Sequence, residues 1–170
     1  PQWQDAGVQL VSDVEPYELM KLRLLNAGHQ GVAYFGSLMG YRYVHDAAQD
    51  AIFAACLLRY MRREAIPTLP PVPGIDLTVY TDSLIERFGN AEIRDTVARL
   101  AAESSDRIPK WLVPVIRANL ASDGEIEVSA AIVASWARYA EGVDEDGEPI
   151  QVVDRLAEER TAAAHRRSDD

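Results

Sequence analysis

Residues 14–40, VEPYELMKLRLLNAGHQGVAYFGSLMG, form one long and mostly apolar helical pattern. Pro16 suits the first turn of a helix, where its missing N–H costs nothing, and Gly40 marks the end. The pattern therefore predicts a helix from Pro16 to about Leu38. Because apolar side chains occur on nearly all of its faces, the helix has little room for a solvent-facing side. The rest of the chain must then supply elements that cover it.

Five further helices follow from the same periodicity. They are predicted over residues 45–64, 77–88, 91–103, 110–121 and 126–141, and residues 152–167 form a polar, partly helical tail. Asp76 is placed as the N-cap of the second of these five, and Pro114 lies in the first turn of the fourth or makes a kink in it. The proline-rich stretch 66–74 is an extended connector, and the segment 104–109, SSDRIP, is expected to break the helix before it.

Ile52 is expected on the apolar face of the helix over 45–64, and Ile93, Val97 and Leu100 are expected to face inward from the helix over 91–103. Residues 7–12, GVQLVS, alternate weakly and are compatible with one short strand. A length of 170 residues suits one domain with a sizeable core. The predicted architecture is therefore all-α, a single multihelical domain over residues 1–170 with at most that one N-terminal strand.

Composition excludes several functional classes. A net charge of −10, without a concentrated stripe of Lys and Arg, argues against a nucleic acid or an anionic membrane as partner. No apolar run reaches the ~20 residues of a membrane-spanning helix, and the N-terminus lacks a signal-peptide pattern. The single cysteine, Cys56, rules out an internal disulfide framework and is compatible with a reducing compartment. We expect a soluble, cytoplasmic protein.

Three polar side chains interrupt the apolar helix: Lys21, Asn26 and His29. At ~100° per residue, Asn26 lies about 140° and His29 about 80° round from Lys21, so the three can share one broad face. Because little of the helix is free, Lys21 is expected to be partly buried. Burial disfavours the ammonium ion and lowers the pKa of a lysine towards neutrality, which makes the side chain usable as a general acid or base.

The same residues have a plain alternative explanation. Lys21 can extend its charged end to the surface, Asn26 can bond a neighbouring carbonyl, and His29 can be a core residue whose hydrogen bonds are satisfied.

Gly28 and Gly36 in the same helix add a further indication, since a glycine costs a helix roughly 1 kcal/mol relative to alanine. Their use predicts close approach by another backbone or by a ligand. Spacing alone leaves the structural and the catalytic interpretations open.

A family resemblance is carried by residues 11–47, which contain the motif Lys-x4-Asn-x2-His at Lys21, Asn26 and His29. This segment resembles the start of the C-terminal domain of the mannitol dehydrogenase family, the long-chain polyol-specific dehydrogenases. The likeness continues through residues 71–117, PVPGIDLTVYTDSLIERFGNAEIRDTVARLAAESSDRIPKWLVPVIR. It covers most of the chain.

The resemblance implies a metal-independent, NAD- or NADP-linked oxidoreductase. The family's lysine is the general base in alcohol oxidation and the general acid in ketone reduction, while its asparagine and histidine hold the reacting oxygen. These roles fall on Lys21, Asn26 and His29. An arginine and, eight residues later, usually a lysine bind substrate hydroxyls in the family, and the matching positions are Arg99 and Arg107. An arginine at 107 departs from the family pattern and affects how substrate would be held.

From the residues themselves, Arg99 is placed on the helix over 91–103 and Arg107 in the loop before Pro109. Loop positions of that kind can reach a cleft, and a guanidinium can bond vicinal hydroxyls or a carboxylate. Metal ligands are scarce, with one cysteine and three scattered histidines, so no zinc site is expected.

The chain lacks Gly-x-Gly-x-x-Gly, the phosphate-binding turn of a nicotinamide-binding Rossmann domain. The family places that domain N-terminal to the motif helix. We therefore expect the chain to be a fragment, the substrate domain of a longer polypeptide that works with its own Rossmann domain. Mannitol and fructose are the first expectation for substrates, ahead of arabinitol oxidation and hexuronate (fructuronate or tagaturonate) reduction. A non-enzymatic helical interaction or dimerisation module is the alternative, and the intact motif favours the enzyme.

Overall fold

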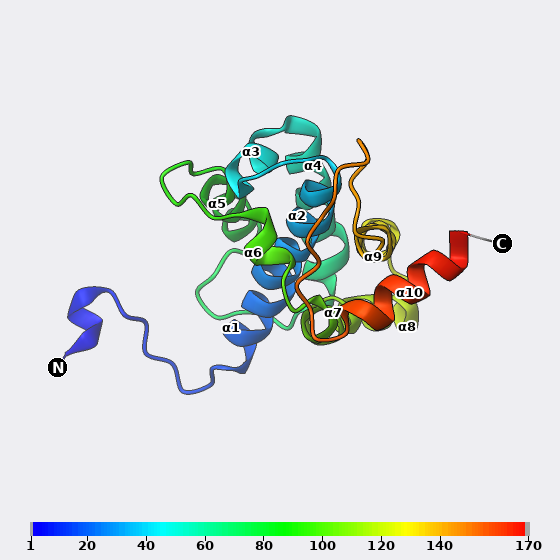
Figure 1. The fold of residues 1–170 in the computed structure, drawn as a ribbon. Helices are drawn as coiled ribbons and strands as arrows, with labels where there is room; N and C mark the ends of the chain where they lie inside the picture. The colour runs from blue at the N-terminus through cyan, green and yellow to red at the C-terminus, as the bar shows by residue number, and fades with distance from the viewer. Residues whose placement is uncertain (1, 169–170) are drawn as a thin grey trace.

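The fold is built from helices, as the ribbon in Figure 1 shows for the computed structural model, which describes residues 2–168. In chain order the elements are a 3-10 turn Trp3–Ala6, α1 (Glu15–Met20), a π-helical turn Lys21–Asn26, α2 (Ala27–Leu38), α3 (Val44–Gln49), α4 (Ala51–Arg59), a second π-helical turn Tyr60–Ala65, a 3-10 turn Ile66–Thr68, α5 (Leu77–Phe88), α6 (Val97–Ala101), α7 (Ser104–Trp111), α8 (Val113–Ser122), α9 (Glu127–Tyr139) and α10 (Ala157–Ser168). Within the described residues the extended pairing amounts to two isolated bridges, Tyr43 with Thr96 and Val143 with Pro149. The all-α prediction is confirmed.

Helix α2 lies at the centre, with α6, α9, α3 and α7 packed around it (Figure 1). Glycines allow this close packing. A Cβ at Gly36 would lie 3.2 Å from a methyl carbon of Val97, and Gly31 is equally tight against side chains of α4 and α9. At Gly28 the nearest atom belongs to Phe88 at 3.7 Å, an ordinary contact. Another element does approach closely at Gly36, but the neighbour is the Val97 side chain and not the predicted backbone or ligand, and at Gly28 the predicted close approach is not found.

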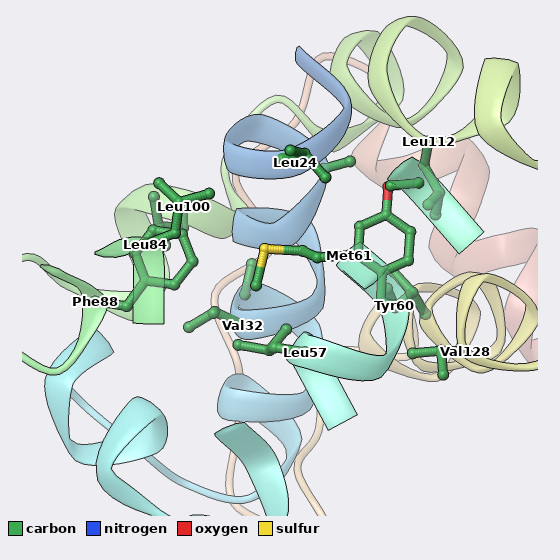
Figure 2. Packing of buried hydrophobic residues seen from close by; sticks show 14 of the residues in the cluster. Leu24, Val32, Leu57, Tyr60, Met61, Leu84, Phe88, Leu100, Leu112 and Val128 are labelled. Carbon is green, nitrogen blue, oxygen red and sulfur yellow. The ribbon is translucent and has the colours of Figure 1, made fainter. Parts of the chain in front are cut away.

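The core surrounds α2 on both sides (Figure 2). Apolar side chains from the α4 side and from α5 and α6 meet those of the central helix and are almost fully removed from water. They include Leu24, Val32, Leu57, Met61, Leu84, Phe88 and Leu100. Burial of each such side chain stabilises the fold by ~1.5–3 kcal/mol.

The helix predicted from Pro16 to about Leu38 is confirmed as one continuous helical run. Its middle, Lys21–Asn26, is wound more loosely as a π-helical turn. Such turns are rare and are frequently found at functional sites. The sequence expectation of a regular 3.6-residue repeat through the motif was therefore wrong at this turn.

One predicted helix is two. The pattern over 45–64 is divided at Asp50, which has extended backbone angles and caps α4 by accepting hydrogen bonds from Ile52 N (2.9 Å) and Phe53 N (3.0 Å). The break turns Ile52 outward, where it is 84% exposed. Its predicted place on the apolar face was wrong, because the prediction assumed an unbroken helical repeat across Asp50, where the helix is interrupted.

The helix predicted over 91–103 is shorter. It begins at Val97 because the preceding residues pair with the segment before α3, with Val44 N donating to Asp95 O (3.0 Å) and Val97 N to Arg42 O (3.1 Å). Ile93 is consequently exposed, contrary to the prediction, while Val97 and Leu100 are buried as predicted.

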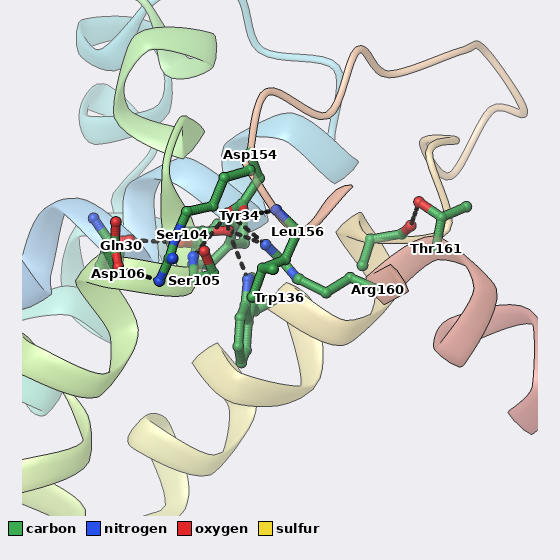
Figure 3. Close-up of polar contacts among 12 residues, drawn as sticks. Gln30, Tyr34, Ser104, Ser105, Asp106, Trp136, Asp154, Leu156, Arg160 and Thr161 are labelled. Atoms are coloured by element: carbon green, nitrogen blue, oxygen red, sulfur yellow. Dashed lines mark hydrogen bonds and ion pairs between the residues drawn. The ribbon is translucent and has the colours of Figure 1, made fainter. Parts of the chain in front are cut away.

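The predicted break at 104–109 is instead helix α7, with Pro109 inside it. The helix start is capped from a distance by Asp154, whose carboxylate accepts from Ser104 Oγ (2.9 Å) and Ser105 N (2.8 Å). The buried carboxylate also pairs with Arg160 of α10 at 2.6 Å. Figure 3 shows this cluster, which fastens the C-terminal segment over α7 and α9.

Other predictions hold. Asp76 caps α5 through Thr78 N and Val79 N, Pro114 lies in the first turn of α8, and α9 covers the predicted range. The possible strand at 7–12 was wrong: these residues are exposed, lack strand pairing, and run away from the helices (Figure 1).

Candidate active site

The π-helical turn brings Lys21 and Asn26 together. Lys21 Nζ donates to Asn26 Oδ1 at 3.1 Å. A five-residue separation would place the two side chains about 140° apart on an ideal α-helix, whereas a π-helical turn, with its i→i+5 hydrogen bonds, is wound more loosely and brings residues five apart closer together. The looser winding therefore creates a pair that the sequence period did not predict.

Lys21 is exposed in this chain, so its predicted partial burial was wrong. Met20 and Leu24 of the same helical run are buried, whereas the Lys21 side chain is open to solvent. Water therefore reaches the ammonium group unless something else covers this surface.

His29 lies one turn beyond Asn26 and is mostly buried against Phe88, with ring centroids 4.6 Å apart. Burial lowers the pKa of His29 to about 4. The negative charge of Asp95 opposes this shift, while the positive charges of Arg99, Lys21 and Arg87 add to it. His29 is therefore neutral at physiological pH and can donate from one ring nitrogen while accepting at the other.

Arg99 is exposed on α6 and is held by Asp95 in a two-pronged ion pair. Its Nε donates to Asp95 Oδ1 at 2.6 Å, and Nη2 donates to Oδ2. The Arg99 guanidinium lowers the pKa of Asp95 and keeps that carboxylate ionised. Because its charge also acts on His29, Arg99 belongs to the same region as the motif.

Arg107 lies on α7, so the loop position predicted for it was wrong. Its Nη1 donates to the carbonyl of Leu100 at 2.9 Å and, more weakly, to that of Arg99 at 3.4 Å. The guanidinium also lies over the ring of Trp111. These contacts tie α7 to the end of α6 and so support the helix that presents Arg99.

A hollow of about 160 Å³ opens beside His29, between α2, α3, α5 and the segment 90–95. Sequence reasoning missed its other polar members, His45, Arg87, Asn90 and Asp95. Only Asp95 carried a usable signal, since an acid four residues before Arg99 predicts an ion pair on a helix. Of the three motif residues, only His29 lines the hollow; Lys21 and Asn26 do not.

Other kinds of site find little support in the described part of the chain. Among residues 2–168, no three His, Cys, Asp or Glu side chains are grouped as a metal would need. In the same range, no helix has the length and apolar character to span a bilayer. The described residues instead bring acid–base and hydrogen-bonding groups near one another, since Lys21 bonds Asn26 and the charges of Lys21 and Arg99 act on His29.

Comparison with known proteins decides the family. The model of the mannitol dehydrogenase C-terminal domain matches residues 13–170. This chain belongs to the mannitol dehydrogenase family. Mannitol dehydrogenase 2 of Saccharomyces cerevisiae is 46% identical over 165 residues, which are 96% of this chain and 33% of the yeast protein. An uncharacterised Escherichia coli oxidoreductase, YdfI, is 41% identical over 156 residues, 92% of this chain and 32% of that protein.

Solved structures of the mannitol dehydrogenase family agree with the fold. The Pseudomonas fluorescens mannitol 2-dehydrogenase, in a ternary complex with NAD and D-mannitol, superposes with a TM-score of 0.91 at 43% identity, covering 96% of this chain and 33% of that one. A substrate-free D-sorbitol dehydrogenase gives 0.88 at 30% identity, covering 95% of this chain and 36% of that one. The chain thus spans about a third of the length of the relatives it matches.

Proposed function

We propose that this chain is the substrate domain, residues 1–170, of an NAD- or NADP-dependent polyol dehydrogenase that interconverts mannitol and fructose. The observation that carries the proposal is the Lys21–Asn26 hydrogen bond at a π-helical turn, one turn before a neutral His29. A dehydrogenase needs a proton acceptor and neutral hydrogen-bonding groups at the reacting carbinol, and these three residues supply them. The NAD and D-mannitol of the P. fluorescens complex support the choice of cofactor and substrate.

The chain's own residues would act as follows. Lys21, as the free amine, takes the proton from the hydroxyl oxygen while hydride leaves the adjacent carbon, and it returns the proton in the reverse direction. Because Asn26 Oδ1 already accepts from Lys21, its amide NH₂ remains to donate to the substrate oxygen. His29 donates a second hydrogen bond to that oxygen. Arg99 would bind hydroxyls further along the substrate, and Arg107 would reach substrate only through N–H groups not used on Leu100.

The nicotinamide cofactor, when bound, accepts the hydride. This chain has no glycine-rich turn of the kind that holds its pyrophosphate, so the group is assigned to a separate Rossmann domain. The exposure of Lys21 supports that assignment, because a second domain laid over this surface would exclude water from the amine. No metal has a part in the proposed reaction. With a single cysteine, the chain suits the reducing cytoplasm.

A substrate panel tests the proposal. The full-length protein, meaning this chain joined to its cofactor domain, would be assayed with mannitol, arabinitol, sorbitol and fructuronate, each with NAD(H) and NADP(H). We expect the highest kcat/KM with mannitol and NAD. Turnover of fructuronate alone would identify the full-length protein as a hexuronate reductase instead of a mannitol dehydrogenase. Absence of turnover with every substrate would contradict an enzymatic function and favour an interaction module.

A further inference from the structure

The hollow beside His29 has a lining of mixed character. Phe88 and Val44 supply apolar wall, while His29, His45 and Asp95 place polar groups in it. Its volume of about 160 Å³ is several times the ~30 Å³ that one water molecule takes in the liquid. Cavities that combine an apolar wall with a few fixed polar groups are typical of small-molecule sites.

One atom in this region lacks a partner. His45 Nδ1 is buried and makes no hydrogen bond in the described structure. The ring itself is well fixed, because it stacks on Tyr43 with centroids 5.3 Å apart and its Nε2 lies 3.3 Å from Asp46 Oδ1. Buried polar atoms are nearly always hydrogen-bonded, so an orphaned nitrogen in a rigid ring indicates a missing partner.

Two other polar residues that line the hollow, Asp95 and Asn90, already make hydrogen bonds. Asp95 is tied to Arg99 by two hydrogen bonds and also accepts from Thr96 N at 2.9 Å. Asn90 Oδ1 accepts from Glu92 N at 2.9 Å. These contacts hold Asp95 and Asn90 in place in the lining of the hollow. The two imidazoles suit a hydroxyl group, since each can donate or accept, and Arg87 and the amide NH₂ of Asn90 add donors to the same lining.

We propose that this hollow is a subsite for the hydroxyl-bearing end of the polyol chain, remote from the reacting carbon, and that His45 Nδ1 binds a hydroxyl there. The inference rests on the proposed function, because His29 joins the hollow to the Lys21–Asn26 pair. A chain held at its reacting carbon by the motif would pass His29 and lay its C–H groups on Phe88. Longer polyols would then gain a contact that shorter ones cannot reach.

Two isosteric substitutions test the nitrogen itself. In His45→Asn the side-chain amide replaces Nδ1, and in His45→Gln it replaces Nε2. With the full-length protein we expect His45→Gln to raise KM for mannitol about fivefold to tenfold, the loss of one hydrogen bond at a buried site. His45→Asn should stay near wild type. A four-carbon polyol, too short to reach the hollow, should show no difference among the three proteins, all with melting temperatures within a few degrees.

Calorimetric binding of mannitol in the presence of cofactor separates the two proposals. If the wild type oxidises mannitol and His45→Gln neither raises KM nor weakens binding, the subsite is overturned and His45 bonds a water only. An equal effect on four- and six-carbon polyols would also overturn it. Binding that depends on His45 without any turnover would leave the subsite standing and remove the proposed function. A wild type that neither binds nor oxidises any polyol would remove both.

Discussion

The hydrogen bond between Lys21 and Asn26 determines which groups each side chain has left for a substrate. Lys21 gives one N–H to the amide oxygen and keeps its lone pair, once deprotonated, for a hydroxyl proton. Asn26 keeps both amide N–H groups. In the proposed reaction the three polar residues predicted from the sequence would act together, and the Lys21–Asn26 part of their geometry depends on a looser helical turn.

Asp95 holds the Arg99 side chain in place, and removing the Asp95 carboxylate should weaken substrate binding. In Asp95→Asn the two-pronged ion pair is lost, and the exposed Arg99 side chain becomes free to adopt many rotamers. We expect KM for mannitol to rise by about fivefold to tenfold in the full-length protein, with kcat changed less, since Arg99 would bind substrate rather than move a proton. Asp82→Asn, which breaks the ion pair with Arg62 outside the hollow, is the matched control and should leave both constants unchanged. A fall in kcat without a rise in KM would count against this role.

His29 predicts a specific dependence of stability on pH. Burial lowers its pKa to about 4, from about 6.5 in the unfolded chain, so between these values the unfolded state binds more protons. The free energy of unfolding should therefore fall as pH drops from 6.5 to 4. Urea unfolding of this chain and of His29→Gln over that range measures the contribution. Equal slopes in the two proteins would show that His29 titrates normally.

At the scale of elements, sequence patterns correctly predicted those features of a helix that depend only on residues within or next to it. Asp76 as a cap and Pro114 in a first turn were confirmed, because capping and the missing proline N–H act within one helix. The predicted start of α6 was wrong, because the actual start is set by a backbone hydrogen bond between Val44 and Asp95. Helix α7 was missed because its cap, Asp154, comes from far along the chain.

The site shows the same division. The sequence was enough to identify the three polar residues of the motif helix, from their residue types, their spacing and the family resemblance. It did not predict the exposure of Lys21 or the helical position of Arg107, because both depend on which neighbours pack where. The roles proposed for Asp95 and His45 rest on contacts between elements, which sequence periodicity does not predict.

Glu64 joins two elements through a buried carboxylate. It is fully buried and caps α9, accepting from Val128 N (2.6 Å) and Ser129 N (2.8 Å). Glu64→Ala should lower the free energy of unfolding by about 3 kcal/mol, because both amides lose a charged partner away from water. Urea denaturation gives the value, with Asp82→Ala as a control whose exposed ion pair contributes little. Equal stability of Glu64→Ala and wild type would contradict the capping role.

At the scale of the whole molecule, the proposed chemistry needs more than this chain. The match to about a third of each relative, and the exposed Lys21, both support a covering domain. We expect the isolated 170-residue chain neither to bind NAD tightly nor to oxidise mannitol, as measured by calorimetry and by steady-state absorbance at the reduced nicotinamide band. Sustained turnover by the isolated chain would show that it holds a complete site.

The central claim, that Lys21 moves the proton, is tested most directly by kcat for mannitol oxidation in the full-length Lys21→Ala variant. General acid–base groups contribute about 100-fold to 10,000-fold, so we predict a loss of that size. The melting temperature of the isolated 170-residue chain should stay unchanged on the same substitution, because the side chain is exposed in this fold. Turnover within about twofold of wild type would contradict the account.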